Sequence, residues 1–75
     1  MNFNHSEKYK KIGIKIAECR TKQGLTQQQL ADKVGISKSY LSKIESPSTI
    51  KPFSLDVLFS IAEALDVGII ELINE

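Results

Sequence analysis

The sequence predicts an all-α fold, a compact bundle of five short helices. Apolar residues recur at intervals of three and four along most of the chain, which is the period of an amphipathic helix. Ser and Thr residues precede several of these segments, where a hydroxyl group can cap the free backbone N–H groups of a helix. Turn-forming residues such as Gly24, Gly35 and Pro47 separate the segments. With 75 residues, 41% hydrophobic and 25% charged, the chain is expected to form one domain over residues 1–75.

The first helix is expected to end before Gly24, with Ser6 or a neighbour as its N-cap and residues 1–5 as a disordered tail. Its apolar side carries residues spaced i, i+4 and i+7: Ile12, Ile16 and Cys19. Alternating isoleucines within the same segment are also compatible with a strand, but the length of the segment and its lysine-rich start favour a helix. Ile14 then lies off the main apolar stripe and needs a partner.

The second helix is predicted over residues 27–34, because Thr26 and Gln29 form a capping-box pattern and Gly35 can end the helix with a positive φ angle. The turn Gly35-Ile36-Ser37 separates it from a third helix, which Ser37 can cap and which runs from Lys38 to about Glu45. So short a turn makes the two helices cross at a steep angle. Residues 27–46 therefore have a helix-turn-helix layout. Its shared core and turn consist of Leu30, Ala31, Val34, Gly35, Ile36, Leu41 and Ile44.

Residues 46–53 are expected to form a loop, because Pro47 and Pro52 cannot continue a helix. Ser54 can cap a fourth helix, whose buried side carries Leu55, Leu58, Ile61, Ala62 and Leu65. After Asp66-Val67-Gly68, a short last helix carries Ile69, Ile70, Leu72 and Ile73.

From Ile12 to Leu72, about four fifths of the chain resembles the phage repressor/Cro-type helix-turn-helix family, often called XRE-like. The matching residues are Ile12-Gly13, Ile16, Arg20, Gly24-Leu25-Thr26-Gln27, Leu30-Ala31, Val34-Gly35-Ile36-Ser37, Tyr40-Leu41-Ser42-Lys43-Ile44-Glu45, Pro52, Leu55, Leu58, Ile61-Ala62 and Leu65. The resemblance implies a lambda-repressor-like DNA-binding domain that usually binds as a dimer. Pro47 and Asp66 stand where family members often have Gly, so the loop after the third helix is expected to take its own path.

The third helix is the expected reading helix for double-stranded DNA. Leu41 and Ile44 define its inward side, which leaves Lys38, Ser39, Ser42 and Lys43 outward. Residues near the N-terminus of such a helix enter the major groove, where Lys can donate to guanine and Ser is nearly indifferent to base identity. The alternative for both lysines is an ordinary solvated face. The full set of candidate DNA-binding residues is Gln27, Ser37, Lys38, Ser39, Tyr40, Ser42 and Lys43.

Two further roles follow from the resemblance alone. Gln27, at the start of the second helix, is expected to grip a phosphate through its amide and backbone N–H, the alternative being a plain solvated residue. Arg20 and Glu45 are expected to form a partly buried ion pair that ties the first helix to the third. For Tyr40, contact with the DNA backbone and packing beside Ile36 remain equally open.

The distribution of charge supports a nucleic-acid partner more than the net charge of +1 does. Residues 1–51 hold all ten basic residues and four acidic ones, whereas residues 52–75 hold five acidic residues and no Lys or Arg. Such a chain can turn a basic face to phosphate and an acidic face away from it. The alternative is chance segregation of solvated side chains.

The expected function is sequence-specific DNA binding by a cytoplasmic transcriptional regulator, repressor-like, that occupies an operator as a dimer. The interface is expected to use residues of the last helix: Ile69, Ile70, Leu72 and Ile73. One Cys and one His argue against an enzyme, a metal site and a cofactor, and neither a membrane segment nor a small-molecule ligand site is expected. An antitoxin or a restriction-modification controller would share the fold, and a protein-interaction module is the competitor from another class.

Overall fold

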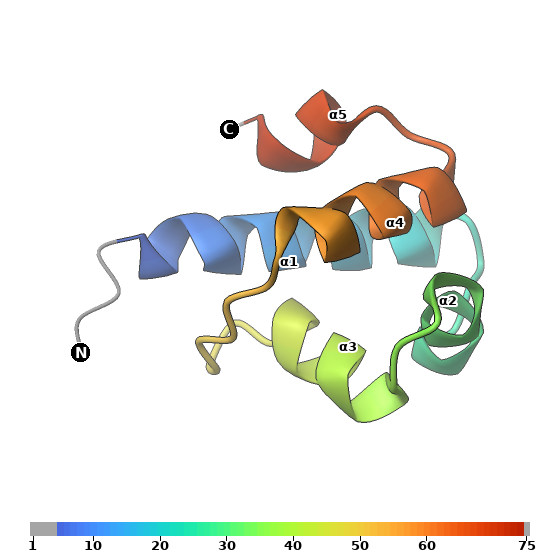
Figure 1. Ribbon diagram of the computed structural model, residues 1–75, viewed down its shortest axis with the longest axis horizontal. Helices are drawn as coiled ribbons and strands as arrows, with labels where there is room; N and C mark the ends of the chain where they lie inside the picture. Colours follow the sequence, from blue (N-terminus) through green and yellow to red (C-terminus); the bar gives the residue numbers. More distant parts are fainter. Residues whose placement is uncertain (1–4, 75) are drawn as a thin grey trace.

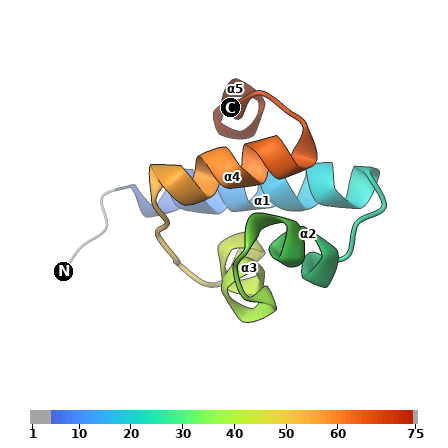
Figure 2. The same cartoon turned by 45° about the vertical axis from the view of Figure 1, so that its right-hand side comes forward.

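The computed structural model describes residues 5–74, which form five α-helices and no strand, as the sequence predicts (Figure 1). The helices are α1 (Ser6–Lys22), α2 (Gln27–Val34), α3 (Lys38–Glu45), α4 (Leu55–Leu65) and α5 (Ile69–Ile73). Helix α1 is the longest and contacts α3, α4 and α5. Figures 1 and 2 show α2 and α3 on one side of α1 and α5 on the other, with α4 running alongside. Of these helices, within residues 5–74, none has the length and apolar character needed to cross a membrane.

Local capping explains where three of the helices begin. The Thr26 hydroxyl accepts the Gln29 N–H at 3.1 Å, and the Thr26 N–H donates to Gln29 Oε1 at 2.8 Å, which completes the predicted capping box. Ser37 and Ser54 cap α3 and α4 in the same way, each accepting a backbone N–H from three residues further on. Replacing such a cap by Ala typically costs about 1 kcal/mol, so these residues set the helix boundaries.

The N-cap of α1 is a neighbour of Ser6, as the prediction allowed. Ser6 is the first helical residue, and the N-cap is His5, which makes no side-chain capping hydrogen bond. The His5 carbonyl accepts the Tyr9 N–H at 3.1 Å, so His5 belongs to the helix end and not to a disordered tail. The rest of the expected tail, residues 1–4, lies outside the described residues.

The core gathers apolar residues from α1 to α5 around one centre. Its buried members are Ile16, Leu30, Ala31, Leu41, Ile44, Leu58, Ile61, Ala62, Leu65 and Leu72. Two predictions about it were wrong in part. Leu55, expected on the buried side of α4, is 67% exposed at the first residue of that helix, beside a hollow that Tyr9 and Ile12 of α1 also line. Val34 and Ile36 are only partly buried and pack against the edge of the core.

Helix α1 approaches α3 so closely that only glycine fits at the crossing. A Cβ atom at Gly13 would collide with the backbone carbonyl oxygen of Ile44. Gly13 is buried and α1 contacts α3 extensively, so this crossing fixes the position of α3 against the rest of the molecule.

Candidate nucleic-acid interface

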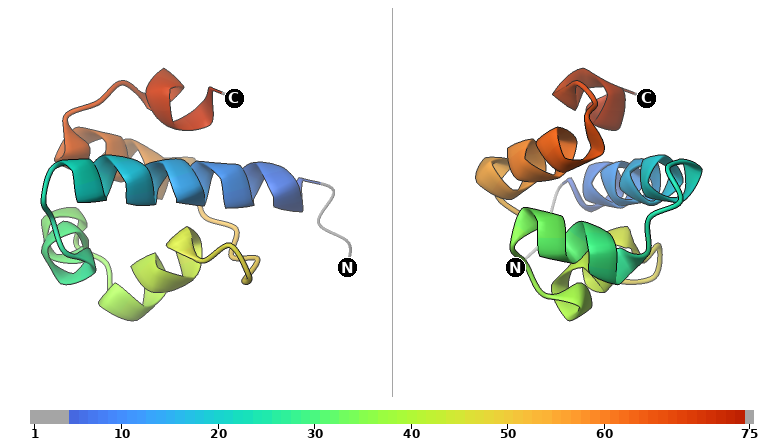
Figure 3. Two further views of the ribbon diagram at one scale, coloured as in Figure 1. Left: turned by 180° about the vertical axis from the view of Figure 1, so that it is seen from behind. Right: turned by 90° about the vertical axis from the view of Figure 1, so that its right-hand side faces the viewer.

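Helices α2 and α3 are joined by the predicted three-residue turn. Gly35 adopts φ +84°, and its N–H donates to the Ala31 carbonyl at 2.8 Å. The Ile36 N–H also reaches the Ala31 carbonyl, at 3.1 Å. Leu30, Ala31 and Leu41 are fully buried, so the two helices share one packed contact. The turn and this contact together hold α3 at a defined angle to α2, which the two views in Figure 3 show.

Packing buries one side of α3 and leaves the other in solvent. Leu41 is 0% exposed and Ile44 3% exposed, and both point into the core. The outward residues form what we name the reading face: Lys38, Ser39, Ser42 and Lys43, all exposed. Ser37, at the N-cap, is also exposed, and its hydroxyl accepts the Tyr40 N–H at 3.0 Å. The reading face therefore combines two exposed ammonium groups with small hydroxyl side chains, on a helix that the core holds in place.

Tyr40 stands at the edge of this face, half-buried against the core. The Lys51 ammonium group lies 5.5 Å from the centre of its ring, a cation–π contact. Lys51 comes from the loop after α3 and was not among the candidates from the sequence. The sequence shows a basic residue directly before Pro52, which could have marked Lys51 as a candidate. Its closeness to Tyr40 could not be predicted, because it depends on the path of the loop. The loop turns at Pro47 and Ser48, and thereby brings a further positive charge to the side of α3.

A buried carboxylate connects α3 to α1 and α2. Glu45 is 7% exposed, and its Oε2 accepts the Arg20 Nε–H at 2.9 Å, while Oε1 accepts an Arg20 Nη2–H at 3.0 Å. The Arg20 Nη1 group donates to the Leu25 carbonyl at 2.7 Å, in the turn before α2. The ion pair expected from the resemblance therefore exists in bidentate form. It compensates the cost of burying the Glu45 charge with several charge-assisted hydrogen bonds.

Gln27, the expected phosphate-binding residue, joins the same network. Its Nε2 donates to Glu45 Oε1 at 2.9 Å. One of its two amide N–H groups is thereby used within the protein, and one remains for another acceptor. The Glu45 carboxylate thus holds Gln27 at the first residue of α2, where backbone N–H groups have no partner within the helix.

Within the described residues, no group of three or more His, Cys, Asp and Glu side chains is arranged to hold a metal ion. Cys19 is a free, partly buried thiol that packs against the core. The two acidic side chains of α2 and α3 accept hydrogen bonds within the protein: Asp32 from Gln28, and Glu45 from Arg20. The chemistry available on this side of the molecule is donation from ammonium, hydroxyl and amide groups, which suits anionic, oxygen-rich partners.

The helix-turn-helix class is defined by two short helices that share a core and are joined by a tight turn. Here the turn contains Gly35 in the left-handed conformation, and the outer face of the second helix is basic. A family profile described as helix-turn-helix matches residues 16–72. The chain belongs to this family, and the resemblance to Cro-type, XRE-like regulators is confirmed.

Two relatives by sequence are HTH-type transcriptional regulators. The chain is 39% identical over 64 residues to the HTH-type transcriptional regulator SinR of Bacillus licheniformis, a match covering 85% of this chain and 57% of SinR. It is 34% identical over 69 residues to the uncharacterized HTH-type transcriptional regulator y4dJ of Sinorhizobium fredii, covering 87% of this chain and 82% of that one. The chain thus spans little more than half the length of SinR.

Solved structures support the same fold. The restriction-modification controller protein C.AhdI from Aeromonas hydrophila superposes with a TM-score of 0.79 at 34% identity, covering 85% of this chain and 94% of that one. SinR, the master regulator for biofilm formation, solved in complex with DNA, superposes with a TM-score of 0.75 at 36% identity, covering 84% of this chain and 98% of that one.

Proposed function

We propose that the chain binds double-stranded DNA in a sequence-specific manner and regulates transcription by occupying an operator, in the manner of a repressor. The observation that carries the proposal is the reading face: Lys38, Ser39, Ser42 and Lys43 are exposed on a helix whose other side is locked into the core. The SinR structure with DNA, 36% identical, supports it. Acting on a bacterial chromosome, as regulators such as SinR do, would place the protein in the cytoplasm.

The dimensions of α3 fit this role. An α-helix with its side chains is about 10–12 Å across, so the eight-residue α3 can lie in a major groove about 12 Å wide. In this pose Lys38 and Ser39 lead toward the base edges, and Ser42 and Lys43 follow. Phosphates flank the helix on the side of Gln27, Ser37 and Tyr40, and the spare amide N–H of Gln27 is available to one of them. Lys51 adds a positive charge on the other side of Tyr40.

We also propose a homodimer through the outer side of α5, with fewer residues than the sequence suggested. Leu72 is 1% exposed and Ile69 packs against the core, so Leu72 belongs to the interior and not to an interface. Ile70, 68% exposed, and Ile73, 46% exposed, carry the proposal. A two-fold pair would present its α3 helices to half-sites about 34 Å apart on one side of the duplex.

The experiment is selection of bound duplexes from a random-sequence library, followed by fluorescence anisotropy on the selected duplex over a salt titration. A sequence-specific binder yields a consensus, and its affinity falls steeply as salt rises because counterions are released from phosphate. A protein-interaction module yields no consensus and no salt-dependent binding, and that outcome contradicts the proposal.

A restriction-modification controller is the second candidate, because the chain covers 94% of C.AhdI with a TM-score of 0.79 but 57% of SinR from Bacillus licheniformis. The two candidates differ in their genes. A controller is expected beside genes for a restriction enzyme and a methyltransferase, with its selected consensus upstream of them. A consensus upstream of unrelated operons would favour the general regulator.

A further inference from the structure

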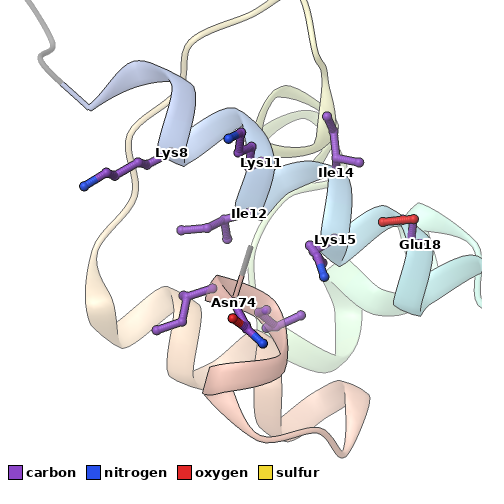
Figure 4. Close-up of a pocket in the computed structure, with 9 residues that line it drawn as sticks. Lys8, Lys11, Ile12, Ile14, Lys15, Glu18 and Asn74 are labelled. Carbon is purple, nitrogen blue, oxygen red and sulfur yellow. The ribbon is translucent and has the colours of Figure 1, made fainter.

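A trough runs between α1 and α5 (Figure 4), and α5 lies on the side of α1 that faces away from α3 (Figure 3). It holds a hollow of about 400 Å³ between Ile12 and Ile14 of α1 and Leu72 and Ile73 of α5. A second hollow of about 290 Å³ continues it past Ile12 and Ile73 toward the start of α4. The two hollows share these residues, so they form one continuous apolar surface, which we name the basic-rimmed trough.

The floor of the trough exposes large apolar side chains to solvent. Ile14 is 42% exposed, Ile73 46% exposed and Leu55, at the far end, 67% exposed. Burying apolar surface of this kind against a partner favours binding, because it removes that surface from water. Contiguous exposed apolar surface bordered by charged groups is typical of an interaction site.

The rim is strongly one-sided in charge. Lys8, Lys11 and Lys15 line the trough, against a single carboxylate from Glu18. Within residues 5–74, neither Lys8 nor Lys15 has a carboxylate within ion-pair distance. Figure 4 shows Ile12 between these two lysines, pointing toward α5. The apolar floor and the two unpaired ammonium groups thus lie within reach of one ligand.

We propose that the basic-rimmed trough binds an acidic amphipathic helix of another protein. Such a helix places apolar residues spaced i, i+3, i+4 and i+7 in a groove, and its carboxylates meet lysines at the rim. The inference goes beyond the proposed function and does not rest on it. Ile73 belongs both to the proposed α5 interface and to the trough, so the acidic helix is expected to compete with the homodimer. Because the trough and α3 lie on opposite sides of α1, the same molecule can hold DNA and this partner together.

A second copy of the chain fits the trough less well. In a two-fold interface the same patch faces itself, so a pair centred on the trough would set lysine rims against each other. Insertion of a partner's α5 would supply only Glu71 from a five-residue helix, against the lysines at the rim. The charge of the rim is complemented by a helix that carries several carboxylates.

The test uses a synthetic helical peptide of about 14 residues, with leucine at i, i+3, i+4 and i+7 and glutamate and alanine elsewhere. Binding is followed by fluorescence anisotropy and by amide chemical shifts of the labelled chain. The expected shifts cluster at Ile12, Ile14, Lys15, Ile73 and Asn74. Lys8→Glu/Lys15→Glu is expected to weaken binding by about tenfold or more, and rising salt to weaken it further.

The matched control is Lys22→Glu/Lys33→Glu, which makes the same charge change at exposed positions away from the trough and is expected to leave affinity unchanged. Thermal melts verify that both double variants are folded. A peptide with lysine in place of glutamate that bound equally well, or shifts spread outside the trough, would overturn the proposal. Sedimentation showing a dimer of the chain alone that Lys8→Glu/Lys15→Glu dissociates would overturn it too, because a second copy would then occupy the trough.

Discussion

Glu45 illustrates how one side chain can organise a small domain. Its carboxylate accepts hydrogen bonds from Arg20 on α1 and Gln27 on α2 while it ends α3. In the ion pair its side chain is 4% exposed and that of Arg20 13%. Such a buried pair need not stabilise the fold on balance, because the cost of desolvating both charges opposes their attraction. Removing one partner, however, leaves the other charge buried without compensation.

We therefore expect Glu45→Ala to lower the free energy of unfolding by about 3–5 kcal/mol, the usual cost of breaking a buried pair. Urea unfolding followed by circular dichroism measures this. Glu7→Ala removes a carboxylate of the exposed pair with Lys10, 3.6 Å away, and serves as the control with an expected cost below about 1 kcal/mol. Equal stability of the two variants would show that the network does not connect the helices energetically.

Substitutions on the reading face are expected to change DNA binding and not stability, because its lysines are exposed and their loss leaves the fold intact. A lysine at a base edge contributes about 1–3 kcal/mol of discrimination, so Lys38→Ala is expected to relax preference at one position of each half-site. A lysine on phosphate weakens all sequences alike and reduces the salt slope by about one. Lys43→Ala is expected to show a mixture of both effects.

Anisotropy on the selected duplex and on its single-base variants, each over a salt series, separates these effects. Lys33→Ala, on the exposed side of α2, is the control and should change neither quantity much. A folded Lys38→Ala/Lys43→Ala double variant with unchanged affinity and salt slope would show that α3 is not the reading helix.

Among the elements, the crossing of α1 and α3 depends most on a single atom. Gly13 is in the middle of α1, where Ala would normally be preferred by about 0.5–1 kcal/mol. Glycine is required here because a Cβ atom would meet the Ile44 carbonyl oxygen, which is backbone and cannot rotate away. Packing between elements therefore outweighs the intrinsic preference of the helix.

Gly13→Ala is expected to destabilise the domain by about 1–3 kcal/mol, the usual cost of overpacking. For a chain of this size that lowers Tm by roughly 4–8 °C for each kcal/mol. Gly68→Ala is the control, since Gly68 has φ −73° and open space around it, and only a small change is expected. A Gly13→Ala variant as stable as the wild type would show that α1 and α3 can move apart without cost.

Across the whole molecule, basic and acidic residues are divided between different helices. The basic first two thirds of the sequence supply α1 to α3, and the acidic last third supplies α4 and α5. Because α3 and α5 lie on opposite sides of α1, an operator bound at α3 as proposed would face Lys38 and Lys43, while Glu71 on α5 would lie away from phosphate. Lys8, Lys11 and Lys15 of α1 border the trough on the far side, so charge alone does not orient the domain, and the contacts of α3 are needed as well.

The proposed dimer is tested on the same scale. Ile70→Asp/Ile73→Asp is expected to give a monomer at tens of micromolar by sedimentation, and to abolish cooperative binding to paired half-sites, because charge replaces the exposed apolar side chains of α5. Leu55→Asp removes an equally exposed apolar residue from α4 and is expected to leave both properties unchanged. A wild-type chain that stays monomeric and binds without cooperativity would exclude the α5 interface.

The sequence alone determined the helices and the helix-turn-helix motif. Capping by Thr26, Ser37 and Ser54 and the left-handed residues Gly35 and Asp66 involve neighbours along the chain, so their effect can be read locally. The outward side of α3 followed for the same reason, once its two buried residues were recognised.

The tertiary structure decided which apolar and polar side chains meet across elements. It placed Leu72 inside and Leu55 outside, joined Gln27 to Glu45, and set Lys51 over Tyr40. The trough between α1 and α5 also depends on how far α5 folds back after Asp66. Such contacts join residues far apart in sequence, and helical periodicity does not specify them, because one apolar stripe allows several partners and only close packing of all five helices selects one.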